Sequence, residues 1–356
     1  MKIGILTQPL RANYGGILQN YALQQVLKQM GHEVWTIDYG KFTWIDWVDN
    51  VWRVLAHKML GHKARFAITP PEKDKIEAPL RRFAENNILL TIPRCKRFNK
   101  KVIRKYGFNA LIVGSDQVWR PMYNYYIKDC FLSFVSHINI KRVAYAASFG
   151  TDKWEFTQQQ TEQCAVLAKR FDGISVREKS GVVLCNKYLG VNATHVLDPT
   201  LLMKSQDYIK LCSHISKREP FIFAYVLDEN EEKRKSIVDF AERRGLPYFI
   251  KGADNTVSYD DTIELWLSYF RDAAFVVTDS FHGTAFSIIF NKDFYVFGNE
   301  KRGNSRFDSL LETFDLKDRM VSNVLPEEIE NIDWAKVNEK RETAITNSKL
   351  WLKQNL

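Results

Sequence analysis

Cysteine is scarce in this chain, and long apolar runs and clustered metal ligands are lacking. Five cysteines are dispersed among 356 residues without a C-x-x-C pair, which argues against a disulfide framework and favours free thiols in a reducing compartment. Cysteine, histidine and acidic residues do not recur at the spacings of a zinc site, so we expect no bound metal. No stretch approaches the roughly 20 apolar residues that a membrane span needs. The first residues lack the features of an export signal, and we expect a cytoplasmic protein.

Positive charge is in excess, because 51 lysines and arginines face 42 acidic residues, a formal net charge of +9. Such an excess suits nucleic acid, an anionic membrane surface or a phosphorylated small molecule. No zinc finger, RNP motif or basic leucine-zipper region is present, so we expect no nucleic-acid partner. An anionic substrate, peripheral contact with the cytoplasmic face of a membrane, and a merely solvated basic surface stay open as interpretations.

Short apolar stretches rich in β-forming residues alternate with helical patterns, which predicts an α/β fold with mainly parallel sheets. Asp198-Pro199 interrupts the series, and we interpret it as a linker because proline does not continue regular structure. The economical architecture is two α/β halves with a cleft between them: residues 1–197, residues 198–330, and a final helix in 331–356. The predicted strands cover residues 2–6, 34–38, 110–113, 142–147, 173–176, 195–197, 221–227, 248–250, 273–277 and 294–296.

Residues from about 42 to 105 break the alternation and form an aromatic and basic insertion in the first half. Within it, apolar residues recur at helical spacing from Trp44 to Leu55, with Lys58, Lys63 and Arg65 nearby. A basic helix with an aromatic face can lie in a membrane interface. The alternative is a helix that packs on its own domain.

The most informative stretch runs from Asp272 to Phe290, where a short apolar strand passes directly into a helix. The junction places His282 at a helix N-terminus, where free backbone N–H groups and the helix dipole favour an anion. Open α/β sheets bind substrates at the carboxyl ends of their strands. We therefore predict a catalytic role for His282. The flanking residues predicted to contact the ligand are Ser280, Gly283 and Thr284.

Two arginines follow other strand or helix boundaries in the same way. Arg177 comes one residue after the strand 173–176, and a fixed guanidinium suits a carboxylate or phosphate. Its alternative role is a surface salt bridge with Glu178. Arg306 lies at the start of another predicted helix and would add positive charge, and Asn304 is a further candidate for donor binding. The alternative role of Arg306 is a salt bridge at the helix start.

Two strand-end loops in the first half carry polar and aromatic residues. Asp116 and Gln117 suit sugar hydroxyls and Trp119 suits a sugar face, although an aspartate after a strand is as often a helix cap. The loop before the first helix permits close backbone approach or simply makes a turn; its candidate residues are Asn13, Gly15 and Gly16. It is not the G-x-G-x-x-G of dinucleotide-binding proteins.

Together these segments resemble the polysaccharide pyruvyl transferase family. The segments are NYGGILQN (13–20), VGSDQVW (113–119), YAASFG (145–150), SVREKS (175–180), VLDPT (196–200), TDSFHGT (278–284) and NSRF (304–307). The resemblance implies two Rossmann-like halves, similar to GT-B glycosyltransferases, and no tightly bound cofactor. It also implies transfer of pyruvate from phosphoenolpyruvate, as co-substrate, onto two sugar hydroxyls. The product would be a cyclic ketal in an exopolysaccharide, a capsule or a lipid-linked precursor.

The resemblance also suggests roles for the candidate residues. His282 would do acid–base work or stabilise the departing phosphate. Arg177 and Arg306 would hold the donor, together with the helix start at Ser280. One departure stands out, because the arginine–leucine pair that some members carry before the histidine is Ser280-Phe281 here. Two other functions stay open: a GT-B-like glycosyltransferase that uses a nucleotide sugar, and a non-catalytic protein that binds anionic surfaces or nucleic acid.

Overall fold

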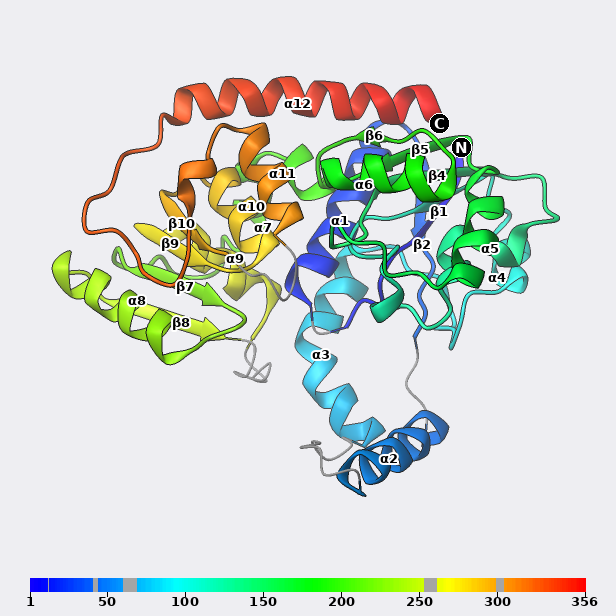
Figure 1. Cartoon of the computed structure of the whole chain (residues 1–356), viewed down its shortest axis with the longest axis horizontal. Coiled ribbons are helices and arrows are strands. Elements are labelled where there is room, and N and C mark those ends of the chain that lie inside the picture. Colours follow the sequence, from blue (N-terminus) through cyan, green and yellow to red (C-terminus); the bar gives the residue numbers. More distant parts are fainter. Residues whose placement is uncertain (12, 41–43, 60–68, 253–260, 299–303) are drawn as a thin grey trace.

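Two parallel β-sheets form the framework of the computed structural model, which describes residues 1–11, 13–40, 44–59, 69–252, 261–298 and 304–356. In Figure 1 the sheets lie side by side with helices packed against them, and the last helix runs across both. The predicted α/β class is therefore confirmed. The borders at 197 and 330, and the cleft between the halves, stay predictions.

The first sheet has six parallel strands in the order β2-β1-β3-β4-β5-β6. Their bounds are β1 Lys2–Leu6, β2 Glu33–Thr36, β3 Ala110–Val113, β4 Lys141–Ala147, β5 Gly173–Val176 and β6 Thr194–His195. The central strand β3 is buried at every position, as expected for an apolar run covered by helices on both faces. Since the strands are parallel, the loops that follow them gather at one edge of the sheet.

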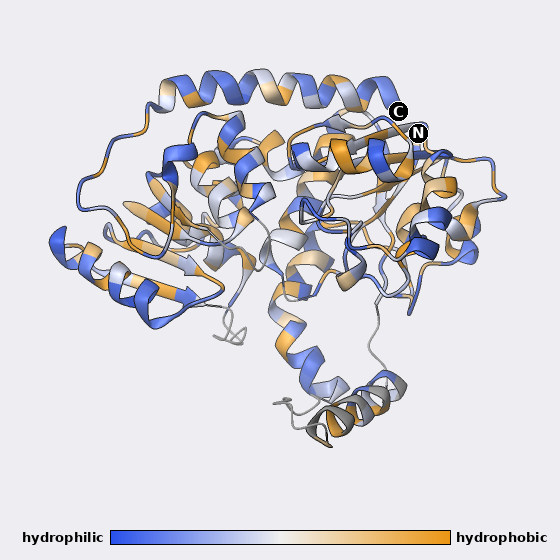
Figure 2. Cartoon of the chain, viewed as in Figure 1, coloured by the Kyte–Doolittle hydropathy of each residue, from blue (hydrophilic) through white to orange (hydrophobic). Residues whose placement is uncertain are grey.

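The second sheet has five strands in the order β11-β10-β9-β7-β8. Their bounds are β7 Ile222–Val226, β8 Tyr248–Gly252, β9 Phe275–Thr278, β10 Phe294–Phe297 and β11 Met320–Val321. Figure 2 shows apolar residues concentrated on these strands, whereas the outer helix α8 is largely hydrophilic. The predicted strands in both sheets agree with the observed ones to within a few residues at their ends.

Most helices begin at a residue whose side chain caps the first turn, among them Asn13, Thr157, Asn230 and Thr262. Such caps satisfy N–H groups that have no partner within the helix. The helix bounds are α1 Tyr14–Gln29, α2 Trp44–Met59, α3 Pro70–Asn87, α4 Lys100–Tyr106, α5 Gln158–Ala168, α6 Lys179–Leu184, α7 Ser205–Leu211, α8 Glu231–Arg243, α9 Ile263–Asp272, α10 Phe281–Ile289, α11 Ser305–Thr313 and α12 Trp334–Asn355.

The segment interpreted as a linker is part of the core, so that interpretation is wrong. Residues Pro199–Leu202 form a buried 3₁₀ turn that contacts α1, α10 and α12. Proline is at home in the first position of such a turn, where its missing N–H is not needed. Asp198 caps the turn, because its Oδ1 accepts from the Thr200 N–H at 2.9 Å. The proline therefore starts a structured turn instead of marking a flexible join.

The predicted helix in the insertion is present as α2, which lies away from both sheets in Figure 1 and is joined to the first half through α3. Its sequence neighbours Lys63 and Arg65 lie outside the described residues. The final helix α12 covers both halves and buries Leu352 and Ile345 against them. No helix in the described ranges is long and apolar enough to cross a membrane.

Candidate active site

Side chains from both halves meet where the strands β3, β5, β6 and β9 end. His282 lies in the first turn of α10, directly after β9, and is 8% exposed. Its Nε2 lies 3.8 Å from Oδ2 of Asp198, which follows β6 in the first half. The same carboxylate oxygen accepts from Nη1 of Arg177 at 2.8 Å and from the Ser115 hydroxyl at 3.0 Å. A single buried carboxylate therefore connects the guanidinium of one half to the imidazole of the other.

The charges around Asp198 keep it ionised although it is almost fully buried. Burial alone raises its pKa, but His282 and Arg177 oppose this effect and hold the pKa well below its usual range. Arg177 is held from a second side, because its Nη2 lies 3.5 Å from Oδ1 of Asp116. Asp116 lies three residues after the end of β3 and has a left-handed φ of 64°. Arg177 is therefore engaged by two carboxylates and does not form the alternative salt bridge with Glu178, which accepts from the backbone N–H groups of residues 149 and 150.

Arg306 is the cation that lacks such partners. It is 7% exposed at the start of α11, and no carboxylate among the described residues lies within ion-pair distance of it. Burial, together with the nearby charge of Arg177, lowers the pKa of Arg306 to about 10. Its guanidinium carbon lies 5.9 Å from the centre of the Phe281 ring, and that of Arg177 lies 4.3 Å from the same ring. The negative face of an aromatic ring attracts cations, so Phe281 helps to hold two guanidinium groups in one region.

Several buried nitrogen atoms in this cluster have no hydrogen-bond partner in the part of the chain that the structure describes: Nε and Nη2 of Arg177, Nε of Arg306 and Nε2 of His282. Buried polar groups are almost always paired, and an unpaired charged donor is costly. These atoms could therefore donate to the oxygens of an anionic ligand. The described residues contain no cluster of ligands suited to a metal ion.

The N-terminus of α1 lies against the imidazole. A Cβ atom added to Gly15 would come 1.9 Å from Nδ1 of His282, so only glycine fits there. Asn13 caps α1, because its side chain accepts from the Gly16 N–H at 2.9 Å. This loop is therefore a structured helix start that closes on the other half of the molecule.

Other predicted ligand contacts are corrected by the structure. Trp119 is fully buried, its ring stacks on Phe131 at 4.7 Å, and its indole N–H donates to the Cys130 carbonyl. It therefore cannot stack on a sugar. Thr284 is also fully buried and donates to the Ser280 carbonyl.

The remaining candidates have structural partners of their own. The Ser280 hydroxyl accepts from the Gly283 N–H, and a Cβ at Gly283 would meet the Thr278 hydroxyl at 2.2 Å, so both residues shape the start of α10. Oε1 of Gln117 accepts from Arg120 at 3.2 Å. Asn304 precedes α11, where its carbonyl accepts from Asp308. Direct ligand contacts by Ser280, Gln117 and Asn304 stay predictions.

The sequence analysis missed Asp198. The signal was available, because Asp198 comes directly after the predicted strand 195–197, as Arg177 comes directly after the strand 173–176. The proline that follows it led instead to the interpretation of this segment as a linker. Asp198 is nevertheless the residue that contacts both His282 and Arg177.

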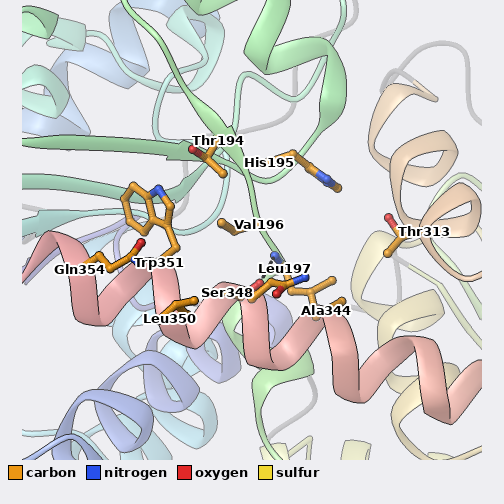
Figure 3. A pocket seen from close by; sticks show the side chains of 11 residues that line it. Thr194, His195, Val196, Leu197, Thr313, Ala344, Ser348, Leu350, Trp351 and Gln354 are labelled. Atoms are coloured by element: carbon orange, nitrogen blue, oxygen red, sulfur yellow. Dashed lines mark hydrogen bonds between the residues drawn. The ribbon is translucent and has the colours of Figure 1, made fainter.

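A separate cavity of about 310 Å³ lies between α12 and β6 (Figure 3). His195 lines it and lies 3.2 Å from the carbonyl of Arg177. Its described lining contains no arginine or lysine, so it suits an anion less well than the cluster around His282.

Comparison of this chain with known proteins identifies one matching family and solved structures of similar fold. The model of the family described as "Polysaccharide pyruvyl transferase" matches residues 13–301. No curated protein matches the sequence. Among solved structures, UGT89C1 of Arabidopsis thaliana complexed with UDP-L-rhamnose has 9% identity and a TM-score of 0.51, with 100% of this chain and 99% of that chain covered. UDP-GlcNAc 2-epimerase of Neisseria meningitidis bound to UDP-GlcNAc has 9% identity and a TM-score of 0.48, with 100% and 94% covered. At this identity the likeness concerns the fold alone, and the expected pair of Rossmann-like halves in a GT-B-like arrangement is confirmed.

The contact between α1 and His282 can be tested directly. We expect Gly15→Ala to displace the imidazole, because the added methyl group overlaps the ring, and to shift the ring nitrogen signals of His282 in NMR spectra. Gly16→Ala is the matched control, since its Cβ would meet the Asn13 side chain at 3.2 Å and can be accommodated by a small shift. Unchanged His282 ring signals in Gly15→Ala would show that the two helix starts do not touch in solution.

Proposed function

Since the chain belongs to the polysaccharide pyruvyl transferase family, we propose that this transferase moves pyruvate from phosphoenolpyruvate to two hydroxyls of a sugar and forms a cyclic ketal. The sugar would belong to an exopolysaccharide, a capsule or a lipid-linked precursor. The observation that carries the proposal is Arg306, a buried guanidinium without a carboxylate partner among the described residues, beside the Phe281 ring, whose centre lies 5.3 Å from that of the His282 imidazole.

The donor fits this arrangement of charges. Phosphoenolpyruvate carries a carboxylate and a phosphate, and both suit guanidinium groups. Arg306 would take one anionic group of the donor. Arg177 would contribute the N–H groups that Asp116 and Asp198 leave unpaired. These two arginines would replace the arginine that some family members have at the position of Ser280.

His282 would carry the proton transfers. It would first protonate the methylene carbon of the donor, which turns that carbon into a methyl group and makes C2 electrophilic. One sugar hydroxyl then attacks C2 and gives its proton to the imidazole. The C2–O bond to phosphate breaks as the imidazole passes that proton to the leaving phosphate, and the second hydroxyl then attacks C2 and gives its proton to the imidazole as the ring closes. An imidazole suits these roles because its unperturbed pKa is close to neutral, and Asp198 would stabilise its protonated form.

A membrane location would suit a lipid-linked acceptor, and helix α2 has the required surface. Five large apolar side chains follow one face at helical spacing and are 44–89% exposed: Trp44, Val48, Trp52, Leu55 and Met59. Tryptophan is favoured at the boundary between water and lipid, and the net charge of +9 suits an anionic surface. We propose that α2 lies in the surface of an anionic membrane with this face toward the lipid.

The reaction can be tested with phosphoenolpyruvate and a panel of nucleotide-linked and lipid-linked saccharides. We expect release of orthophosphate and a product heavier by the mass of pyruvic acid minus water. His282→Ala should lose about 10²–10⁴-fold in turnover while staying folded, because positioned acid–base catalysis contributes that factor. The exposed His214 provides the control variant His214→Ala, with normal turnover. A folded His282→Ala with normal turnover would eliminate the assigned role, and release of a nucleoside diphosphate without phosphoenolpyruvate would favour the glycosyltransferase.

The role of Arg306 gives a distinctive pair of effects. We expect Arg306→Met to leave the unliganded protein at least as stable, because the variant removes a buried charge that has no carboxylate partner in the described part of the chain. It should abolish the stabilisation by phosphoenolpyruvate, which at about 100 times Kd is about 2.7 kcal/mol for the parent protein. Arg319→Met is the control, since Arg319 is equally buried but bonded to Asp318 and the Glu330 carbonyl. It should lower the melting temperature and keep the ligand response. A phosphoenolpyruvate response that survives in Arg306→Met would contradict the donor site.

Membrane contact can be measured by co-sedimentation with vesicles. We expect binding to phosphatidylglycerol vesicles and little binding to phosphatidylcholine. Changing Trp44 and Trp52 to alanine should weaken the binding by about tenfold or more, because burial of one large apolar side chain contributes about 1.5–3 kcal/mol. Changing the equally exposed Val166 and Val183 to alanine should have no effect. Equal binding by both double variants would refute the proposed surface.

A further inference from the structure

A row of exposed tyrosines lies next to the cluster around His282. Tyr123, Tyr125 and Tyr126 are 50%, 82% and 52% exposed, in the loop that follows β3. They line a cavity of about 140 Å³ together with Gln8, from the loop after β1, and Tyr39, from the loop after β2. We call this cavity the tyrosine pocket. Exposed aromatic side chains gathered at one place commonly mark a binding surface.

Ion pairs hold two of the tyrosine rings in place. The guanidinium of Arg97 lies 3.8 Å from the centre of the Tyr126 ring and is bonded to Asp129. That of Arg120 lies 5.1 Å from the Tyr123 ring and is bonded to both oxygens of the Glu155 carboxylate, at 2.9 and 3.0 Å. Each arginine lies over the ring of its tyrosine and is itself held by its carboxylate partner. Tyr125 packs edge-on against Tyr126 at 4.9 Å. Rings that are fixed before a ligand arrives lose less freedom on binding.

The tyrosine pocket adjoins the cluster through Gln117. The side chains of Gln8 and Asn124, which line the pocket, donate to the Gln117 carbonyl at 2.9 and 3.1 Å. The preceding residue, Asp116, lies 3.5 Å from Nη2 of Arg177. The pocket is therefore linked to Arg177 through Gln117 and Asp116, two neighbouring residues of the loop after β3.

We propose that the tyrosine pocket binds a sugar ring of the acceptor, and this assignment rests on the function proposed above. A sugar ring has an apolar face that packs on an aromatic ring and hydroxyls at its edge that bond to phenol and amide groups. The charged groups that line the pocket are paired, Arg97 with Asp129 and Lys96 with Asp46, so the pocket suits a neutral sugar better than an ionic ligand. The tyrosine loop would thus provide the aromatic surface that Trp119, buried in the core, does not.

Binding can be measured without turnover, by saturation-transfer NMR. The probes are the methyl glycosides of glucose, galactose, mannose, N-acetylglucosamine and N-acetylmannosamine, with UMP as a separate probe. We expect transfer to at least one glycoside, and Tyr125→Ala and Tyr126→Ala should weaken its binding by about fivefold or more, as is usual when an aromatic side chain central to an interface is truncated. Tyr125→Phe should retain most of the binding, because it keeps the ring. Tyr248→Ala, on β8 of the other sheet and 44% exposed, is the control.

The outcomes separate this assignment from the reaction itself. No transfer to any glycoside, or equal binding by Tyr125→Ala and the Tyr248→Ala control, would overturn the pocket. Loss of UMP binding without loss of glycoside binding in Tyr125→Ala would also overturn it, in favour of a nucleotide. Glycoside binding at the tyrosines without phosphoenolpyruvate turnover would support the pocket and refute the pyruvyl transfer. With turnover established, the tyrosine variants should raise KM for the saccharide about fivefold or more and leave KM for phosphoenolpyruvate unchanged.

Discussion

The arrangement of the site depends on the contacts that the buried carboxylate of Asp198 makes. It is buried after β6, accepts from Arg177 and Ser115, and faces the imidazole of His282. A buried carboxylate stays ionised only with such partners. In return, Arg177 is committed to holding Asp198 and Asp116, which limits how much of its guanidinium a ligand can use. The two predicted arginines therefore differ: Arg177 contacts two carboxylates, and Arg306 has no carboxylate within ion-pair distance among the described residues.

The position of the His282 imidazole also depends on contacts between the two halves. Gly15 at the start of α1 lies against it, Tyr14 stacks on Trp266 of the second half with ring centres 5.4 Å apart, and the N–H of Lys179 donates to the Ser309 hydroxyl. Two helix starts thus approach each other across the join, one from each half. The imidazole of the second half is in this way placed beside the strand-end loops of the first, which is the placement that the proposed transfer between two substrates requires.

The fold was largely predictable because it follows from local patterns. Buried parallel strands appear as short apolar runs, and helix starts appear as capping residues, so His282 and Arg177 could be placed at strand ends before their contacts were known. Side-chain direction was not predictable in the same way. Asp116 and Trp119 are three residues apart, but the left-handed φ at Asp116 turns the chain, so that one side chain reaches Arg177 while the other enters the core. Whether a buried cation has a partner, the decisive property of Arg306, depends on residues far away in the sequence.

The replacement of arginine–leucine by Ser280-Phe281 is consistent with this distribution of charge. The Ser280 hydroxyl caps α10, and an arginine there would lose that cap and add a third guanidinium to the two beside Phe281. The charge of Arg177 already lowers the pKa of Arg306, so a third cation would increase the repulsion. The ring of Phe281, in place of leucine, has a negative face that attracts both guanidinium groups. The aromatic residue that departs from the family pattern therefore lies beside the arginine at the start of α11, and its ring is approached by the guanidinium groups of both Arg177 and Arg306.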